Sequence, residues 1–137
     1  MLSHIDNYDA WPPSLTREQF LARANDVGGT CWRYDFAVSH GKPFGAGEWG
    51  VASGVGQNGG GDNPSFIQWM WEFFQDKAGE NLRYEACFNT CEPNNVGSNI
   101  YLPPGPNCVF QNPASAQRYL SLWGGTTWPS AAADGLG

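Results

Sequence analysis

The stretch Gly41-Lys42-Pro43-Phe44-Gly45-Ala46-Gly47-Glu48-Trp49-Gly50 decides the predicted fold of this chain. Residues 42–48 predict a short strand that ends on a single carboxylate, after which glycine dominates the sequence. Glycine lets a backbone approach a neighbouring strand or a ligand closely, because it carries no Cβ. Two interpretations stay open for Glu48: a functional carboxylate at a strand end, or a polar residue that closes a strand.

The segments on either side predict helices that alternate with strands. Residues 5–11 predict a strand that ends in a loop, and residues 82–89 predict a further strand. Four helices are expected: one capped by Ser14 or Thr16 and stopped by Gly28-Gly29, and three more over residues 30–39, 64–77 and 113–123. Strands that alternate with helices indicate a parallel sheet, so the predicted fold class is α/β.

The two clearest helices have well-marked starts and expected inner faces. Asp62-Asn63-Pro64 is a typical helix start, and apolar residues follow it at helical spacing over residues 64–77. In the last helix, Tyr119, Leu120 and Trp123 are expected to face inward. Glycine-rich residues 51–61 and residues 90–112 are expected to be loops, and the tail after Gly124 is expected to be mobile.

Composition excludes several classes of function. The 137 residues carry a net charge of −6 without any Lys/Arg cluster, which argues against a nucleic-acid binder. No run of about 18 apolar residues predicts a membrane span, and the N-terminus does not resemble a signal peptide. Seven tryptophans on an acidic, lysine-poor chain suit a neutral ligand with apolar faces, such as carbohydrate, although tryptophan also fills protein cores.

The four cysteines are Cys31, Cys87, Cys91 and Cys108. Their irregular spacing, without a Cys-x-x-Cys motif, argues against a zinc site, so no metal is predicted. A disulfide between Cys91 and Cys108 would staple a loop rich in Pro, Asn and Gly, and free thiols are the alternative.

Four motifs in order resemble the C-terminal half of a (β/α)8 glycoside hydrolase, most closely family 26 in the clan of β-mannanases and endoglucanases. The first three are Asp6-x-Tyr8-Asp9-x-Trp11-Pro12, Asp35-Phe36-Ala37-x-x-His40-Gly41-Lys42-Pro43 and Gly47-Glu48-Trp49-Gly50. The fourth combines two segments, Gly61-Asp62-Asn63-Pro64-x-Phe66-Ile67 and Tyr84-Glu85-Ala86-x-Phe88-Asn89. The resemblance covers roughly residues 4–123. It implies a partial TIM barrel, made of the last two to three βα units, over residues 1–123, followed by a flexible tail at residues 124–137.

The resemblance also implies a site. Glu48 would match the nucleophile at the end of the seventh barrel strand, and hydrolysis of a β-linked polysaccharide would proceed with retention. Tyr8 and Trp11 would line sugar subsites on the loop after the sixth strand, and Trp49 would lie beside the nucleophile. For all three aromatic residues, core packing is the alternative. No cofactor is implied, and the family suggests an extracellular protein.

The chain departs from the family at the second carboxyl group. Retaining hydrolysis needs a proton donor about 5–5.5 Å from the nucleophile, which the family supplies from the fourth strand, and no such segment is present. Asp9 is expected on a loop and Asp35 in a helix. Glu85 is expected on the strand face opposite Tyr84, as a structural acid inside the barrel or in a salt bridge to Arg83 or Arg33. Without an acid, the rate loses a factor of about 10²–10⁴.

A partial barrel would also expose two sheet edges. A closed eight-stranded barrel needs roughly 250 residues, so this chain supplies less than half of one. Its helices are expected to cover one side of the sheet only. We therefore expect a homodimer, a complementing N-terminal half-barrel as partner, or a rearranged compact unit. The alternative function is a non-catalytic carbohydrate-binding or degenerate module that works with a partner chain.

Overall fold

The computed structural model describes residues 3–8, 16–54, 59–103, 105, 106, 108 and 110–124, with the backbone alone for residues 3–8. Its elements are β1 (Ser3–Tyr8), α1 (Arg17–Asn25), α2 (Thr30–Ser39), β2 (Phe44–Gly50), α3 (Pro64–Lys77), β3 (Leu82–Cys87) and α4 (Pro113–Trp123). The expected α/β class is confirmed. The predicted helices over residues 30–39, 64–77 and 113–123 have the observed bounds.

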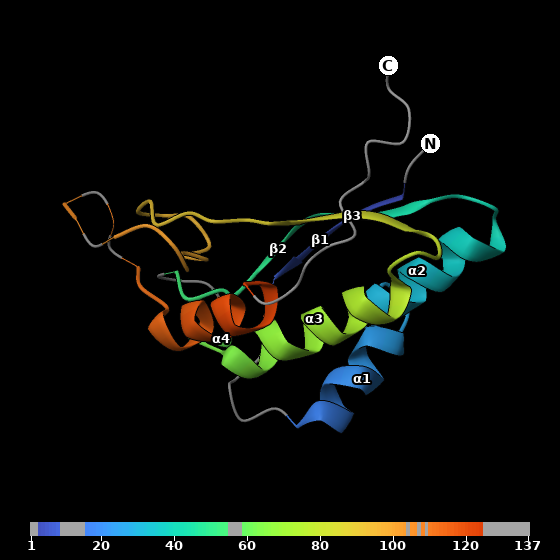
Figure 1. Ribbon diagram of the computed structural model, residues 1–137, viewed down its shortest axis with the longest axis horizontal. Helices are drawn as coiled ribbons and strands as arrows, with labels where there is room; N and C mark the ends of the chain where they lie inside the picture. The colour runs from blue at the N-terminus through green and yellow to red at the C-terminus, as the bar shows by residue number, and fades with distance from the viewer. Residues whose placement is uncertain are drawn as a thin grey trace, which may run out of the picture.

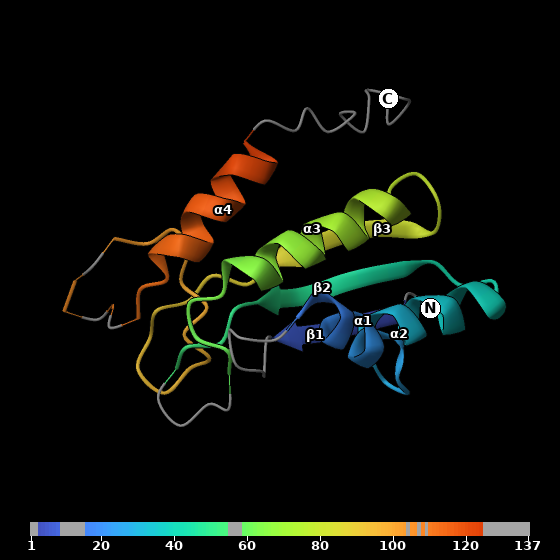
Figure 2. The same cartoon turned by 90° about the horizontal axis from the view of Figure 1, so that it is seen from below.

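The three strands form one parallel sheet in the order β1-β2-β3. Each strand therefore pairs with the strand that follows it in the sequence, and the chain crosses over through helices between them. Figures 1 and 2 show α1 to α4 on the same side of this sheet, which leaves its other side without a described helix. The expectation that the helices cover one side only is confirmed for the described residues.

Local sequence signals explain where the helices begin. Thr16 caps α1 in a capping box, since its hydroxyl accepts from the Gln19 amide and the Gln19 side chain accepts from the Thr16 amide. Asn63 caps α3 by accepting from the Phe66 amide at 3.2 Å, with Pro64 in the first turn, where a missing N–H is harmless. The first helix ends at Asn25, three residues before the expected glycine stop.

The core lies between the sheet and the helices. Its fully buried side chains come from β2 and α3 and include Phe44, Trp49, Ile67, Met70 and Phe74. Leu120, expected to face inward, is 65% exposed, so that prediction was wrong. Tyr119, Leu122 and Trp123 pack against the core instead, because these positions share the face of α4 that meets α3.

Candidate functional site

The carboxyl end of β2 contains an irregularity that determines which side each residue faces. Ile5 pairs with Ala46, but the next residue of β1, Asp6, pairs with Glu48, so Gly47 is an extra residue in β2. Ala46 and Trp49 both belong to the core on the helix side, although strict alternation would place residues three apart on opposite sides. The bulge resolves this conflict, and it assigns Gly47 and Glu48 to the side away from the helices.

Glu48 is half-buried at this position. Its register partner on β1 is Asp6, and Trp49 next to it pairs with Asn7. Asp6 is not among the acids expected from the sequence, because its proximity to Glu48 depends on the shifted register of two strands about 40 residues apart. Two acidic residues thus occupy neighbouring register positions at one end of the sheet.

An aromatic ring lies on the same side of the sheet. Gly45 pairs with Tyr84 of β3, and a Cβ atom built on Gly45 would lie 2.5 Å from the Tyr84 ring. The ring therefore rests directly over the Gly45 backbone, which only glycine permits. Tyr84 remains 40% exposed, so its outer face is open to solvent or to a ligand.

Trp49 does not line this surface. Its indole is fully buried and packs on the helix side against Phe74 and stacks on Trp123 at a centroid distance of 5.5 Å. The expectation that Trp49 binds substrate is corrected, since a ring without exposed area has no face to offer a sugar. The core alternative describes this residue.

Glu85 lies on the helix side of the sheet. Its carboxylate accepts hydrogen bonds from Nε1 of Trp49 and, at 3.1 Å, from Nε1 of Trp123. Burial raises the pKa of Glu85, and the two indole donors oppose that rise. The prediction that Glu85 faces away from Tyr84 agrees with these contacts. The expected position inside a barrel is wrong, because Glu85 lies on the helix side of the sheet, and two indoles take the place of the expected salt bridge. Glu85 is thus separated from Glu48 by the sheet itself.

The loops that follow β2 and β3 meet at the carboxyl end of the sheet. The amides of Ser53 and Gly54 both donate to the Val96 carbonyl, at 3.0 and 2.8 Å. The Ser98 side chain closes over Gly50, where an added Cβ would lie 3.0 Å from the Ser98 Cβ. Ligand sites of α/β proteins form at this end of parallel strands, because the loops there converge.

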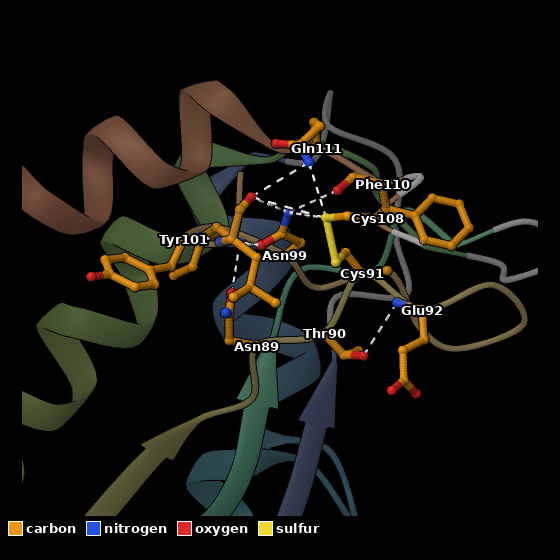
Figure 3. The surroundings of a disulfide bond; sticks show 12 residues. Asn89, Thr90, Cys91, Glu92, Asn99, Tyr101, Cys108, Phe110 and Gln111 are labelled. Carbon is orange, nitrogen blue, oxygen red and sulfur yellow. Dashed lines mark hydrogen bonds between the residues drawn. A yellow bond between two sulfur atoms is a disulfide. The ribbon is translucent and has the colours of Figure 1, made fainter. Parts of the chain in front are cut away.

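A disulfide and a buried amide hold the long loop in shape. Cys91 and Cys108 form a disulfide, which confirms the pairing that the loop composition suggested. As Figure 3 shows, the Asn99 side chain lies beside this bond. It donates to the Phe110 carbonyl at 2.9 Å and accepts from the Tyr101 amide at 3.1 Å. The Asn99 side chain thus satisfies buried backbone groups of the described part of this loop.

The remaining predicted site residues fall partly or wholly outside the described structure. Tyr8 is the last residue of β1 and its backbone pairs with Gly50, but its side chain is outside the described part of the chain. Trp11 and the tail at residues 124–137 lie outside it as well, apart from Gly124. Asp35, weighed as an acid, is exposed in the middle of α2.

Among the described residues, no group of three or more His, Cys, Asp and Glu side chains gathers closely enough to hold a metal ion. Within the same residues, no helix has both the length and the apolar character that a bilayer crossing requires.

Comparison of the chain with protein-family models, with curated proteins and with solved structures found no match. The resemblance to glycoside hydrolases therefore rests on the motifs and their order in this sequence alone.

Proposed function

We propose that this chain forms the last βα units of a (β/α)8 glycoside hydrolase-like barrel and carries its nucleophile, Glu48. The observation that supports this most is the sheet itself: strands in the order β1-β2-β3, parallel, with the described helices on one side. A barrel wall has this sequential order and an outer layer of helices, whereas a doubly wound sheet has helices on both faces. The uncovered side would then be the barrel interior.

The bulge in β2 supports the role of Glu48. It turns this carboxylate to the uncovered side at the carboxyl end of the strand, where barrel enzymes place their catalytic residues. In the proposed reaction, a Glu48 oxygen forms a bond to the anomeric carbon as the glycosidic C–O bond breaks. A second acid protonates the departing alcohol and then deprotonates the water that releases the sugar with retained configuration.

The proton donor is the component of the proposed site with the least support from this chain. Asp6 stands at the register position beside Glu48, and it is the first candidate to test. The family pattern would place the donor on a strand that this chain lacks. In that case the acid, and the rest of the barrel, come from a partner: a second copy or a complementing N-terminal half.

The proposed substrate is a β-linked polysaccharide or oligosaccharide such as mannan, β-glucan or cellulose. Tyr84 supplies one half-exposed ring on the proposed interior face, and the resemblance adds Tyr8 and Trp11. The Cys91–Cys108 disulfide favours an oxidising compartment, in agreement with an extracellular protein. No cofactor enters the proposed mechanism.

A non-catalytic sugar-binding module is the second candidate. The half-exposed Tyr84 ring beside Gly45 favours it, because a ring backed by a glycine surface can stack on a sugar without any proton transfer. This function would require Tyr84 and leave Glu48 without effect on binding.

The two candidates separate in an experiment that does not need the missing acid. The probe is a fluorosugar that carries a dinitrophenolate leaving group. This leaving group departs without protonation, and the sugar remains bound to the nucleophile as a stable ester. We expect intact-mass spectrometry to show one added glycosyl group on the wild-type chain, none on Glu48→Gln, and full labelling of the control Glu18→Gln, whose side chain is exposed on α1.

The variant Asp6→Asn tests whether Asp6 is the acid. If Asp6 is the acid, this variant is still labelled by the activated sugar but no longer cleaves a natural glycosidic bond. Equal labelling of Glu48→Gln and wild type would eliminate Glu48 as the nucleophile. Sugar binding that persists in Glu48→Gln and disappears in Tyr84→Ala would support the binding module.

A further inference from the structure

A cavity of about 530 Å³ lies on the helix side of the molecule, between α1, α2 and α3. Figures 1 and 2 show these three helices on the side of the sheet that the proposed catalytic face does not use. Its volume is within the range of about 300–1,000 Å³ that small-molecule sites occupy. The cavity is therefore distinct from the surface that contains Glu48.

Four aromatic side chains form part of the cavity wall, beside charged and small residues. Phe20 of α1 stacks on Trp69 of α3 with ring centroids 4.9 Å apart, and Tyr34 of α2 meets Phe73 of α3 edge to face at 5.9 Å. Met70 also lines the cavity and is fully buried. Flat rings fixed by their neighbours on two sides suit a ligand with a flat apolar body.

Some charged side chains that line the cavity pair with an opposite charge, and one does not. Arg17 pairs with Glu72 at 3.0 Å, and Lys77 pairs with Asp76 at 2.9 Å while its ammonium lies 5.0 Å from the Tyr34 ring centroid. Both basic side chains that line the cavity are thus already engaged. Asp35 of α2 also lines it and has no hydrogen-bond or ion-pair partner among the described residues.

We propose that this cavity binds a small ligand with a flat aromatic or alicyclic body and one ammonium group, which pairs with Asp35. The four aromatic rings contact the body of the ligand, and the unmatched carboxylate selects the cation over an anion. The Cys31 thiol lines the same cavity one helical turn before Asp35. A ligand bound in the cavity should therefore slow the chemical modification of this thiol. This proposal is independent of the glycoside hydrolase function, since no residue of the cavity lies on the proposed catalytic face.

The test uses two probes that differ in charge, phenethylamine and phenylpropionate, with the full chain. We expect phenethylamine to bind in calorimetry and to slow maleimide modification of Cys31, and phenylpropionate to do both more weakly. Cys87 is the second free thiol of the described chain and lies outside this cavity, so its modification rate is the internal control. Equal protection by both probes, or no binding of the amine, would overturn the proposal.

Three variants locate the site. Asp35→Asn should weaken amine binding by about threefold, a modest effect because Asp35 is solvent-exposed. Ala24→Leu fills the cavity from α1 and should abolish binding, whereas Ala22→Leu, exposed on the same helix and outside the cavity, should bind like wild type. Unchanged binding in both Ala24→Leu and Asp35→Asn would also overturn the proposal. If Ala24→Leu does not fold, the charge-matched probes and Asp35→Asn still decide it.

Discussion

The indole of Trp49 donates a hydrogen bond to the carboxylate of Glu85, and this contact links the two strands β2 and β3 on the helix side of the sheet. Nε1 of Trp123 in α4 donates to the same carboxylate. One acid thus connects the last helix to the central strand. The same contact accounts for the orientation of Trp49, which is held away from the face that Glu48 occupies.

Glu85 should make stability depend on pH. Its pKa is raised above the ordinary value of 4.5, so between 4.5 and the higher folded value the native state holds a proton that the unfolded chain has released. The free energy of unfolding should therefore fall as pH rises through this window and level off above it. Urea unfolding at a series of pH values measures the slope.

Glu85→Gln should remove that part of the pH dependence. It should also lower stability by about 1 kcal/mol, because the amide retains one acceptor oxygen for two indole donors. Glu80→Gln, at an exposed site after α3, is the matched control. A Glu85→Gln protein whose unfolding follows the wild-type pH profile would contradict the role assigned to this carboxyl group.

Trp123→Phe should destabilise the chain by about 1–3 kcal/mol. The substitution removes the donor to Glu85 and reduces the stacking of this ring on Trp49 at 5.5 Å and on Tyr119 at 4.3 Å. Leu120→Ala on the same helix should change stability by less than about 0.5 kcal/mol, since Leu120 is exposed. Chemical denaturation of the two variants tests this difference, and equal losses would contradict it.

Asp62 should be required for the start of α4. Its carboxylate accepts from the Ala114 amide at 2.9 Å, from the Ser115 amide at 2.8 Å and from the Ser115 hydroxyl. Asp62→Ala should therefore lower the free energy of unfolding by about 1–2 kcal/mol, the usual effect of losing a helix cap. Asp26→Ala, exposed after α1, should have little effect. Circular dichroism during denaturation compares the two.

The disulfide should contribute about 3 kcal/mol. Cys91 and Cys108 are 17 residues apart, and closing a loop of this length restricts the unfolded chain by roughly that amount. The double replacement with serine should show this loss under non-reducing conditions, whereas Cys31→Ser should leave stability nearly unchanged. If a reductant destabilises wild type and the double variant equally, the disulfide does not account for the effect.

Helix and strand content followed from local signals in the sequence. The cap at Asn63 with Pro64 fixed the start of α3, and the apolar spacing over residues 113–123 gave the bounds of α4. These predictions succeeded because caps and helical periodicity act over a few residues. The cysteine pair could be anticipated for a similar reason, since both thiols flank one loop.

The side on which each residue of the site lies depended on tertiary structure. One extra residue, Gly47, separates the orientation of Ala46 from that of Trp49, and it is visible only as a shift in the pairing with β1 and β3. The same shift brings Asp6 next to Glu48, and it is the reason that Trp49 was wrongly assigned to substrate. Sequence patterns carry residue type and spacing, whereas strand register is set by contacts between segments far apart in the chain. The sequence alone thus determined the elements and the candidate carboxylate, and the packing of three strands decided which groups share a face with it.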